Sequence, residues 1–503
     1  MRKLLSLCLA LLMVLSAVSA LASCGETTPD QPTDKTTESA TARTDDGQTT
    51  ETEEQKPVET VTKPAIPETD RDALLKVLHW TVDETWIPWE EICLFDFTGD
   101  VIDDAIYART SELHEKFGIS LENEYMYVSD ITHKVKNMTS SGTDEYQLIV
   151  QRSYQMQYSM MDDVFDNLSS LPHVDLSQPY WSQVSVDTFT FGGVTLFAAS
   201  DMLLMDKSST AAVAFNTSLA NDHGWGGTYF YDLVRNNEWT FQKLVETASQ
   251  AYVDLDGDTV VGPGDIFGAQ GGDSPIHFLF NGSGEMFCRN TKDDRFLEYT
   301  FDKERCYNVI MDVLDLMVYD GWYILDKSTV PNAFVNNKVL FDIARIESIN
   351  KYRVMEQDYG ILPIPMYDDT QNGRYYSEIS PHHDSVLAVP HTATDNDSQA
   401  EALGAALEEL AYISHLTVYP VLYDVVISGK GTRDQESKEM LKIIFDSRIY
   451  DMGIIYDFAY FADKTLRMGK TGSSDIVSAY TEVQGEIEKQ LGEVVTKLHE
   501  LLD

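Results

Sequence analysis

The sequence predicts an α/β fold in which mainly parallel sheets are flanked by helices. The chain has 503 residues, of which 43% are hydrophobic and 11% aromatic, and this is ample for packed cores. From residue 74 onward, apolar runs of strand length alternate with segments of helical periodicity. Such alternation is typical of parallel sheets with helices on both faces. The length corresponds to two or three domains or to one large two-lobed unit.

The first folded segments follow a β-α-β-α-β order. Residues 74–80 (LLKVLHW) are expected to form a short buried strand. Residues 101–117 place a set of apolar residues on one helical stripe: Ile102, Ala105, Ile106, Leu113 and Phe117. A second strand is expected from residue 119, a helix near 131–138 and a third strand at 146–150. Ligands bind beyond the carboxyl ends of such strands, so the residues that follow them are site candidates: Trp80, Thr81, Arg152, Ser153 and Tyr154.

The charge balance excludes nucleic acid as a partner. The chain has 37 Lys and Arg against 82 Asp and Glu, a formal net charge of −45. DNA- and RNA-binding proteins neutralise phosphates with clustered Lys and Arg, and a surface this acidic repels polyanions. A polyanionic ligand is disfavoured for the same reason.

The five cysteines are too few for a disulfide scaffold, and their spacing offers no zinc site. Cys8 lies in the apolar N-terminal run. Cys288 and Cys306 lie 18 residues apart, so they either form a bridge that leaves Cys93 alone or remain thiols.

The first 23 residues have the pattern of an export signal. Arg2 and Lys3 precede an apolar run, and Leu21-Ala-Ser-Cys24 resembles the bacterial lipobox, in which the Cys is lipidated and becomes the new N-terminus. Cys24 is therefore expected to carry fatty acyl chains such as palmitate and to anchor the protein on the extracellular face of the cell membrane. An ordinary secretory signal with a chance Cys is the alternative. No second apolar run of 18 or more residues follows.

Residues 24–71 are expected to form a disordered Thr/Glu/Pro-rich linker. Residues 25–70 include 13 Thr, 12 acidic residues and no aromatic residue. Such a segment cannot bury enough apolar surface to fold. We interpret it as a flexible stalk between the membrane and the globular part.

The most informative stretch is 211–270. In it a strand that ends in Phe215-Asn216 leads into a helix, and Trp239-Thr240-Phe241 opens another helix, with Thr240 as a reasonable N-cap. This arrangement resembles the family 1 extracellular solute-binding proteins, the lipid-anchored receptors of carbohydrate-type ABC importers, and in particular their clostridial members. Further stretches fit the same resemblance: DLSQPYW before Ser182, FVNNKVLFDIARIESI from Phe334, DYGILPIPMYDD from Asp358 and RDQESKEMLKIIFDSRIYDMG from Arg433.

The resemblance implies a two-lobed periplasmic-binding-protein-like fold of type II. The N-terminal lobe is then expected at 72–207 plus 362–393, and the C-terminal lobe at 208–361 plus 394–503. The family holds a solute in the cleft between its lobes and encloses it by hinge closure. The resemblance further implies a monomer that captures a solute, with an oligosaccharide favoured, delivers it to the ABC permease subunits, requires no cofactor and performs no catalysis.

An acidic loop has the ligand spacing of an EF-hand-type calcium site: Asp254, Asp256, Asp258, Val260 and Asp265. Two departures weaken the match, because position 6 is Thr259 instead of Gly and position 12 is an Asp instead of a bidentate Glu. A structural calcium site and a solvated acidic turn therefore both remain open.

Aromatic residues can stack on the apolar faces of sugars, and Trp80, Trp181 and Trp322 are candidates for that role, with a core role as the alternative for each.

His382 and His383 are adjacent and point to opposite sides of an extended chain, so a shared metal is not expected. The resemblance instead places them near a crossover between the lobes, where they could line the cleft.

A surface-anchored glycan hydrolase and an adhesion or scaffolding protein remain the competing functions. No GxSxG signature is present, and no carboxylate pair is singled out by spacing.

Overall fold

The computed structural model describes residues 61–81, 89–258, 262–318, 322–328, 330–349, 351–352, 355–427 and 435–502. All of them belong to the second of two compact units, Glu59–Asp503. The expected signal sequence, Cys24, most of the expected linker and Val260 lie outside the described residues. No helix in the described part of the chain is long and apolar enough to cross a bilayer.

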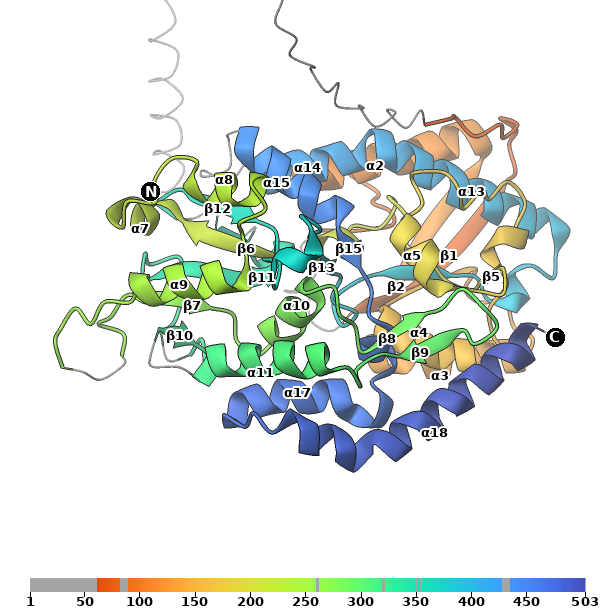
Figure 1. The fold of residues 1–503 in the computed structure, drawn as a ribbon. Coiled ribbons are helices and arrows are strands. Elements are labelled where there is room, and N and C mark those ends of the chain that lie inside the picture. Colours follow the sequence, from red (N-terminus) through yellow and green to blue (C-terminus); the bar gives the residue numbers. More distant parts are fainter. Residues whose placement is uncertain are drawn as a thin grey trace, which may run out of the picture. The chain divides into compact units, whose positions relative to one another are not determined.

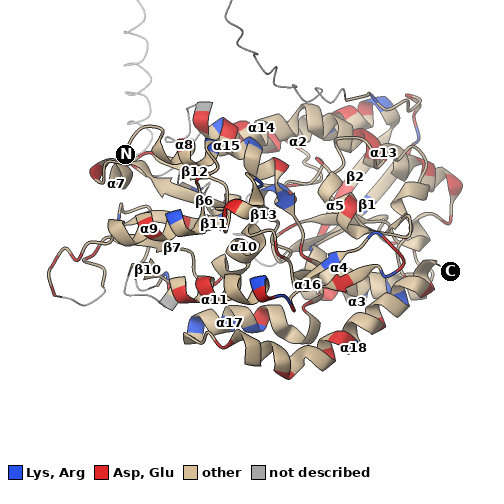
Figure 2. Cartoon of the chain, viewed as in Figure 1, with Lys and Arg blue, Asp and Glu red and all other residues tan. Residues whose placement is uncertain are grey.

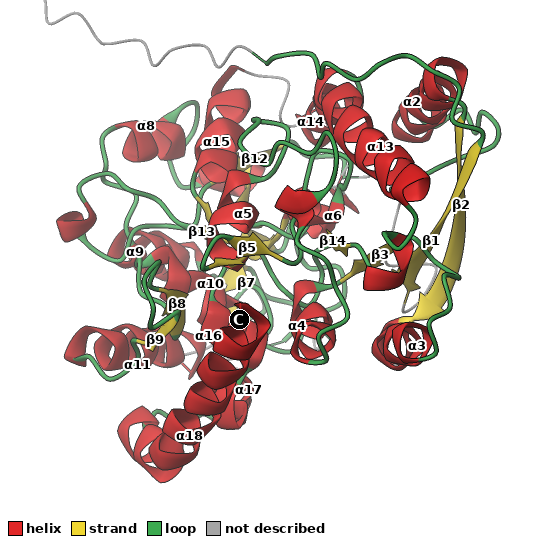
Figure 3. Cartoon of the chain, turned by 90° about the vertical axis from the view of Figure 1, so that its right-hand side faces the viewer, coloured by secondary structure: helices red, strands yellow, loops and turns green. Residues whose placement is uncertain are grey.

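The first sheet has four strands in the order β14–β3–β1–β2 (Figure 1). Its strands are β1 (Ala73–Thr81), β2 (Ile119–Tyr127), β3 (Leu148–Gln151) and β14 (Val386–Ala388). The first three pair in parallel, and β14 is antiparallel to β3. Helices α2 and α13 lie on one side of this sheet and α3 and α4 on the other (Figure 3). Their bounds are α2 (Val101–Phe117), α3 (Val128–Ser140), α4 (Ser153–Met161) and α13 (Asp397–Leu416).

Helix α2 confirms the predicted stripe and shows why the helix has these ends. The Asp100 carboxylate caps its start by accepting from the backbone N–H of Ile102 at 2.9 Å. Gly118 ends it with φ of 63°, a left-handed conformation that glycine adopts without a Cβ penalty. Ile102, Ile106, Leu113 and Phe117 are buried, as the periodicity predicts.

The second sheet has five strands in the order β10–β7–β11–β6–β12. Its strands are β6 (Ala211–Asn216), β7 (Phe267–Gln270), β10 (Tyr323–Ile324), β11 (Val339–Arg345) and β12 (Tyr359–Leu362). β10, β7 and β11 run parallel, whereas β6 is antiparallel to both β11 and β12. All residues of β6, β7 and β12 are buried, which is typical of strands covered on both faces.

Helices and short strands complete the described part. The helices are α5 (Gln183–Phe189), α6 (Met205–Ser208), α7 (Thr217–Asp222), α8 (Tyr229–Arg235), α9 (Phe241–Ala251), α10 (Pro275–Gly282), α11 (Glu304–Val318), α12 (Ile346–Ile349), α14 (Val418–Ile427), α15 (Gln435–Asp446), α16 (Met452–Tyr456), α17 (Phe461–Thr471) and α18 (Ile476–Leu502). The 3-10 turns are η1 (Leu168–Ser170), η3 (Asp369–Gln371), η4 (His391–Ala393) and η5 (Phe458–Tyr460). The two-stranded pairs are β4 (Thr190–Phe191) with β5 (Val194–Thr195), β8 (Cys288–Asn290) with β9 (Leu297–Tyr299), and β13 (Ser377–Glu378) with β15 (Arg448–Ile449).

The start of α9 confirms the expected N-cap. The Thr240 hydroxyl accepts from the backbone N–H of Lys243 at 3.2 Å and so caps the helix. Trp239 is fully buried, and its Nε1 donates to the carbonyl of Pro363 at 2.9 Å. The tryptophan therefore anchors the helix start against the chain that follows β12.

Three chain segments connect the two sheets and lie side by side. The first runs from Ala198, which bridges to Leu387 of β14, to Thr210, which bridges to Ile379. The second runs from Ile379 back into β14, and the third contains β15, which pairs with β13. Of the expected lobe boundaries, 207/208 lies in the first segment, 361/362 lies within strand β12, and 393/394 follows β14.

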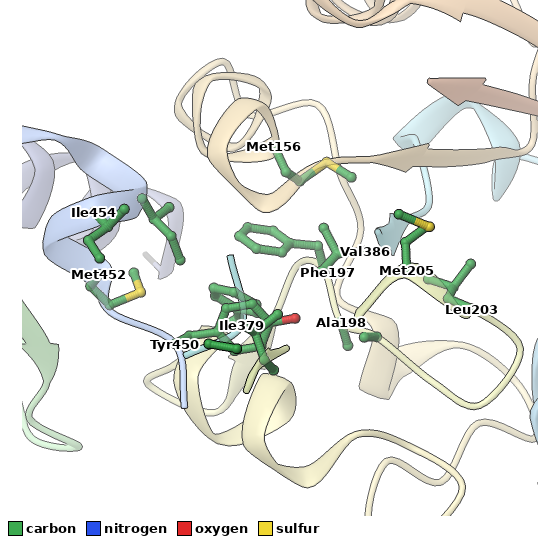
Figure 4. Packing of buried hydrophobic residues seen from close by; sticks show 14 of the residues in the cluster. Met156, Phe197, Ala198, Leu203, Met205, Ile379, Val386, Tyr450, Met452 and Ile454 are labelled. Atoms are coloured by element: carbon green, nitrogen blue, oxygen red, sulfur yellow. The ribbon is translucent and has the colours of Figure 1, made fainter. Parts of the chain in front are cut away.

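Apolar packing is continuous through these connections. Figure 4 shows side chains of α4, β14, α16 and the connecting segments in one cluster: Met156, Phe197, Ala198, Leu203, Met205, Ile379, Val386, Tyr450, Met452 and Ile454. Each of these residues is buried. The junction is therefore a packed core and not a loose tether.

The three described cysteines are thiols. Cys93, Cys288 and Cys306 are all buried and unbridged, so the alternative in which Cys288 pairs with Cys306 is wrong for this structure. Cys306 lies against Glu285 and the carbonyl of Thr300, both 3.5 Å from its Sγ. Burial raises the pKa of Cys306 to about 12.

Candidate functional site

A cavity of about 320 Å³ lies between elements that belong to the two sheets. It is lined by Tyr154 of α4, His382 of the second connecting segment, His277 of α10, and residues of α16, α17 and the turn between them: Ile454, Asp457, Tyr460, Ala462, Asp463, Leu466 and Arg467. Helix α4 follows parallel strand β3, and α10 follows parallel strand β7. The cavity therefore lies where α/β sheets bind ligands, beyond the carboxyl ends of parallel strands.

Aromatic rings form part of its wall. The rings of Tyr154 and His382 have centroids 4.2 Å apart at an interplanar angle of 45°. Tyr460 is 69% exposed, so its ring is available to solvent and to any occupant of the cavity. A large exposed aromatic residue at the lip of a cavity can stack on a ligand.

The backbone that presents Tyr460 is strained. Asp457, Ala459 and Tyr460 have φ of 43°, 53° and 56°, in the left-handed region that non-glycine residues rarely adopt. Hydrogen bonds hold this turn: Asp457 Oδ1 accepts from the N–H of Ala462 at 3.0 Å, and Gln490 Oε1 accepts from the N–H of Ala459 at 2.8 Å. Strain maintained in this way is concentrated at functional sites.

A second group of polar side chains lies behind Tyr154, at the end of β1. Trp80 is buried, and its Nε1 donates to Ser385 Oγ at 2.9 Å. The guanidinium carbon of Arg152 lies 4.3 Å from the centroid of the Trp80 ring. Ser385 donates to Glu91 Oε2 at 2.7 Å, and Glu91 Oε1 accepts from the N–H groups that open α6, including that of Met205 at 2.8 Å. This group therefore ties the end of β1 to two of the connecting segments.

Burial makes most titratable groups near the cavity neutral at pH 7. It lowers the pKa of His382 to about 4 and also lowers that of His383, with nearby Arg345 and Arg152 contributing. Burial raises the pKa of Asp384 to about 8, although Asp384 Oδ1 accepts from the N–H of Ser153 at 3.0 Å. The histidines are then uncharged and Asp384 is mostly protonated, while Arg152 keeps its charge because its pKa falls only to about 10.

The acidic loop brings three of its five expected ligands together. One carboxylate oxygen from each of Asp254, Asp256 and Asp265 lies within 4.8 Å of the other two. Asp265 is buried; its Oδ2 accepts from the N–H of Gly262 at 2.9 Å, and its Oδ1 has no hydrogen-bond partner. Asp258 is not one of the three. Oxygen-only donors around an unsatisfied buried carboxylate fit a hard cation such as Ca²⁺.

Comparisons with known proteins were decisive for the fold. No family model and no curated protein matches the chain. An ABC substrate-binding protein, Lmo0181 from Listeria monocytogenes in complex with cycloalternan, matches 84% of this chain and 99% of its own with a TM-score of 0.54 at 11% identity. The maltose/maltodextrin-binding domain MalE from Bdellovibrio bacteriovorus bound to maltotriose matches 83% and 99% with a TM-score of 0.51 at 15% identity. The cyclic α-maltosyl-1,6-maltose binding protein from Arthrobacter globiformis matches 83% and 99% with a TM-score of 0.51 at 10% identity. The chain has the type II periplasmic-binding-protein-like fold.

In this type II fold the two sheets form the two lobes, and the cavity is an interlobe cavity. The structure brings together five of the eight residues expected to bind a ligand: Trp80, Arg152, Tyr154, His382 and His383. Thr81 is the last residue of β1 and pairs with Tyr127 of β2. Trp181 and Trp322 lie elsewhere in the core. Trp181 is fully buried and donates to Glu408 Oε2 at 2.9 Å, and the carbonyl of Trp322 accepts from the N–H of Gly268 at 2.9 Å.

Several residues of the interlobe site were missed from sequence. His277, Asp457 and Tyr460 line the cavity, but they are far from Tyr154 in sequence. Their approach depends on the third connecting segment, which no local pattern indicates. The one signal is the aromatic run Phe458–Phe461, and such a run is as typical of a core as of a site.

Proposed function

We propose that this protein is an extracellular solute-binding protein of a carbohydrate-type ABC importer, a lipoprotein anchored through Cys24. It captures an oligosaccharide between its two lobes and delivers it to the membrane permease subunits without chemical change. The observation that carries the proposal is the interlobe cavity, to which both lobes contribute aromatic and polar side chains. The structures of the same fold named above support it, since their names describe binding proteins and two name a bound saccharide.

The chemistry of the cavity suits a sugar. Sugars present apolar C–H faces and many hydroxyls, so their sites combine aromatic rings with polar groups that donate and accept. Here Tyr154 and Tyr460 supply rings, neutral His382 and His277 supply ring nitrogens, and Asp457 supplies a carboxyl group. An uncharged imidazole has one donor and one acceptor nitrogen, which matches the character of a hydroxyl. His277 Nε2 is already bonded to the carbonyl of Ala462 at 3.1 Å, so a hydroxyl would meet this ring at Nδ1.

The connections suit hinge closure around the solute. Three segments link the lobes, and a rotation of one lobe needs only changes at a few residues of these segments. The cavity lies beside the second of them, because His382 is part of it. Closure would therefore bring Tyr460 toward a solute held against Tyr154.

The acidic loop fits a structural calcium ion as part of the same proposal. Asp254, Asp256 and Asp265 would provide carboxylate oxygens that hold the loop between α9 and β7. The loop is not among the residues that line the cavity. Calcium would therefore stabilise the C-terminal lobe and take no part in solute binding.

Thermal unfolding of the purified protein against neutral and acidic oligosaccharides, with peptides in separate wells, tests the function. A ligand that binds only the folded state raises the midpoint by mass action. We expect a rise of several degrees with one class of saccharide, with that saccharide recovered unchanged, and a loss of the rise in Tyr154→Ala. Consumption of the saccharide would favour the hydrolase, a rise with peptides alone would exclude the carbohydrate assignment, and no rise with any solute would favour a scaffold.

A further inference from the structure

Arg152 differs from the other largely buried arginines of the described residues. Arg109 donates to three backbone carbonyls and to Ser414 Oγ. Arg345 pairs with Glu347 at 2.8 Å and Arg448 with Asp206 at 3.0 Å. Arg152 is only 9% exposed, yet its buried Nε has no hydrogen-bond partner and its guanidinium forms no ion pair among the described residues.

The nearby groups do not neutralise Arg152. Among nearby carboxyl groups, Asp384 has the largest electrostatic effect on Arg152. Burial, however, keeps Asp384 mostly protonated at pH 7. Glu347, from the other lobe, also interacts electrostatically with Arg152, but it is already paired with Arg345. His382 and His383 are uncharged at that pH. The face of Trp80 offers a cation–π contact but accepts no hydrogen bond from the N–H groups at the guanidinium edge.

The position of Arg152 indicates which ligand group could accept hydrogen bonds from its guanidinium. It is the residue between β3 and α4, two positions before Tyr154, and it lowers the pKa of His382, which lines the interlobe cavity. The first backbone N–H groups of α4 are already bonded, that of Ser153 to Asp384 and that of Tyr154 to Pro381. Among the residues that the structure describes, the guanidinium Nε therefore remains an unpartnered donor at this end of the site, and a planar fork of N–H groups matches a carboxylate.

We propose that the solute is an acidic saccharide, and that Arg152 binds its sugar carboxylate while the rings of Tyr154 and Tyr460 contact the sugar. This inference rests on the function proposed above and narrows it to saccharides that bear a uronate or a similar acid group. A single carboxylate is compatible with the acidic surface of the protein, because exposed charges farther away than about 10 Å are largely screened at 0.1 M salt. Arg467, the arginine among the residues that line the cavity, already pairs with Asp463.

Calorimetric titration with matched pairs of saccharides tests the proposal. The pairs differ by an acid group: galactotriose and trigalacturonate, xylotriose and its glucuronate-substituted form, lactose and sialyllactose. We expect at least one acidic member to bind about tenfold more tightly than its neutral partner, the factor typical of one charge-assisted hydrogen bond. Arg152→Met is expected to abolish that preference, so that the acidic and neutral members of a pair bind with affinities within about threefold of each other. Arg289→Met, which removes an exposed arginine from β8, is the matched control and should retain the preference.

Two further measurements keep the test decisive if Arg152→Met does not fold. Arg152→Lys retains the charge but not the fork, and it should show an intermediate preference. For the wild-type protein, added salt should weaken binding of the acidic saccharide more than binding of its neutral partner. Equal or tighter binding of all neutral members, or an unchanged preference in the Arg152 variants, would overturn the inference and leave the proposed function intact. Failure of every saccharide to bind would overturn both.

Discussion

Asp206 and Arg448 are 242 residues apart in sequence and form a buried ion pair, with Arg448 Nη1 3.0 Å from Asp206 Oδ2. Asp206 lies on the first connecting segment and Arg448 on the third. Lys207 extends the network, because its Nζ lies 2.8 Å from Asp206 and 3.1 Å from Asp201. His415 of α13 completes it with a 2.6 Å bond from Nδ1 to Asp201. The network fastens two of the three connections to each other and to helix α13, which packs against α2 and β1 of the first sheet.

Removal of Arg448 is expected to be strongly destabilising. Arg448→Met would leave the fully buried Asp206 with Lys207 as its only cationic partner among the described residues. Breaking a buried pair from one side costs roughly 3–5 kcal/mol. Urea unfolding monitored by circular dichroism would measure this free energy. The control is Arg289→Met, whose exposed pair with Glu298 is expected to cost less than about 1 kcal/mol. A loss in Arg448→Met no larger than in the control would contradict the prediction.

Asp384 is expected to make stability fall as pH rises. An unfolded Asp releases its proton near pH 4, whereas burial holds that of Asp384 up to about pH 8 in the folded protein. Between these values the folded state binds more protons, so the contribution of this group declines across the window as pH increases. Asp384→Asn retains an oxygen for the N–H of Ser153 and cannot ionise.

The melting temperature of Asp384→Asn relative to the wild type should therefore be higher at pH 8 than at pH 5. Differential scanning fluorimetry at both values would measure it. Asp293→Asn is the control, because hydrogen bonds from Arg295 lower the pKa of Asp293 well below this range. An equal difference at pH 5 and pH 8 for Asp384→Asn would show that the group does not titrate in this window.

Tyr460→Gly should separate stability from binding. Glycine adopts the φ of 56° at this position without a Cβ penalty, and the exposed ring contributes little to the core, so the free energy of unfolding should stay constant or rise by up to about 1 kcal/mol. Loss of the ring should weaken saccharide binding about tenfold in calorimetry. Lys292→Gly relieves a φ of 61° at an exposed site away from the cavity and should leave binding unchanged. Unaltered binding in Tyr460→Gly would exclude this ring from the site.

Calcium should stabilise the protein through the acidic loop. We expect 1 mM calcium to raise the melting temperature above that measured in EDTA, because a ligand of the folded state stabilises it by mass action. Asp265→Asn should lose this rise, as should Asp254→Asn, while Asp326→Asn, in an exposed turn of the same lobe, should keep it. Identical melting temperatures in calcium and EDTA would leave the loop as a solvated acidic turn.

Local patterns predicted the local structure well. The apolar run at 74–80 became β1, the stripe from Ile102 to Phe117 became the buried face of α2, and Thr240 caps α9. These features depend on neighbours within one or two turns, which periodicity and capping rules describe. The topological rule that ligands bind beyond parallel strands also selected Tyr154, which lines the cavity, and Arg152, which precedes it by two residues and contacts Trp80.

Long-range features could not be obtained in this way. Trp181 and Trp80 look alike in sequence, yet Trp181 bonds to Glu408 in the core and Trp80 lies against Arg152. The opposite wall of the cavity comes from Asp457 and Tyr460, whose position depends on how the chain crosses between lobes for the third time. That Arg152 Nε lacks a hydrogen-bond partner among the described residues is likewise evident only once its surroundings are known.

Hydrogen exchange with and without a bound saccharide tests the central claim most directly. Figure 2 shows acidic residues spread over the peripheral helices. A solute that is only weakly attracted to the surface would not slow exchange in both lobes at once, whereas a solute enclosed between the lobes would. We predict that one saccharide slows backbone amide exchange at the same time in 152–158, in 380–385 and in 457–467, and that Tyr154→Ala removes all three effects. Slowed exchange in one lobe alone, or in none of these segments while the saccharide is bound, would contradict it.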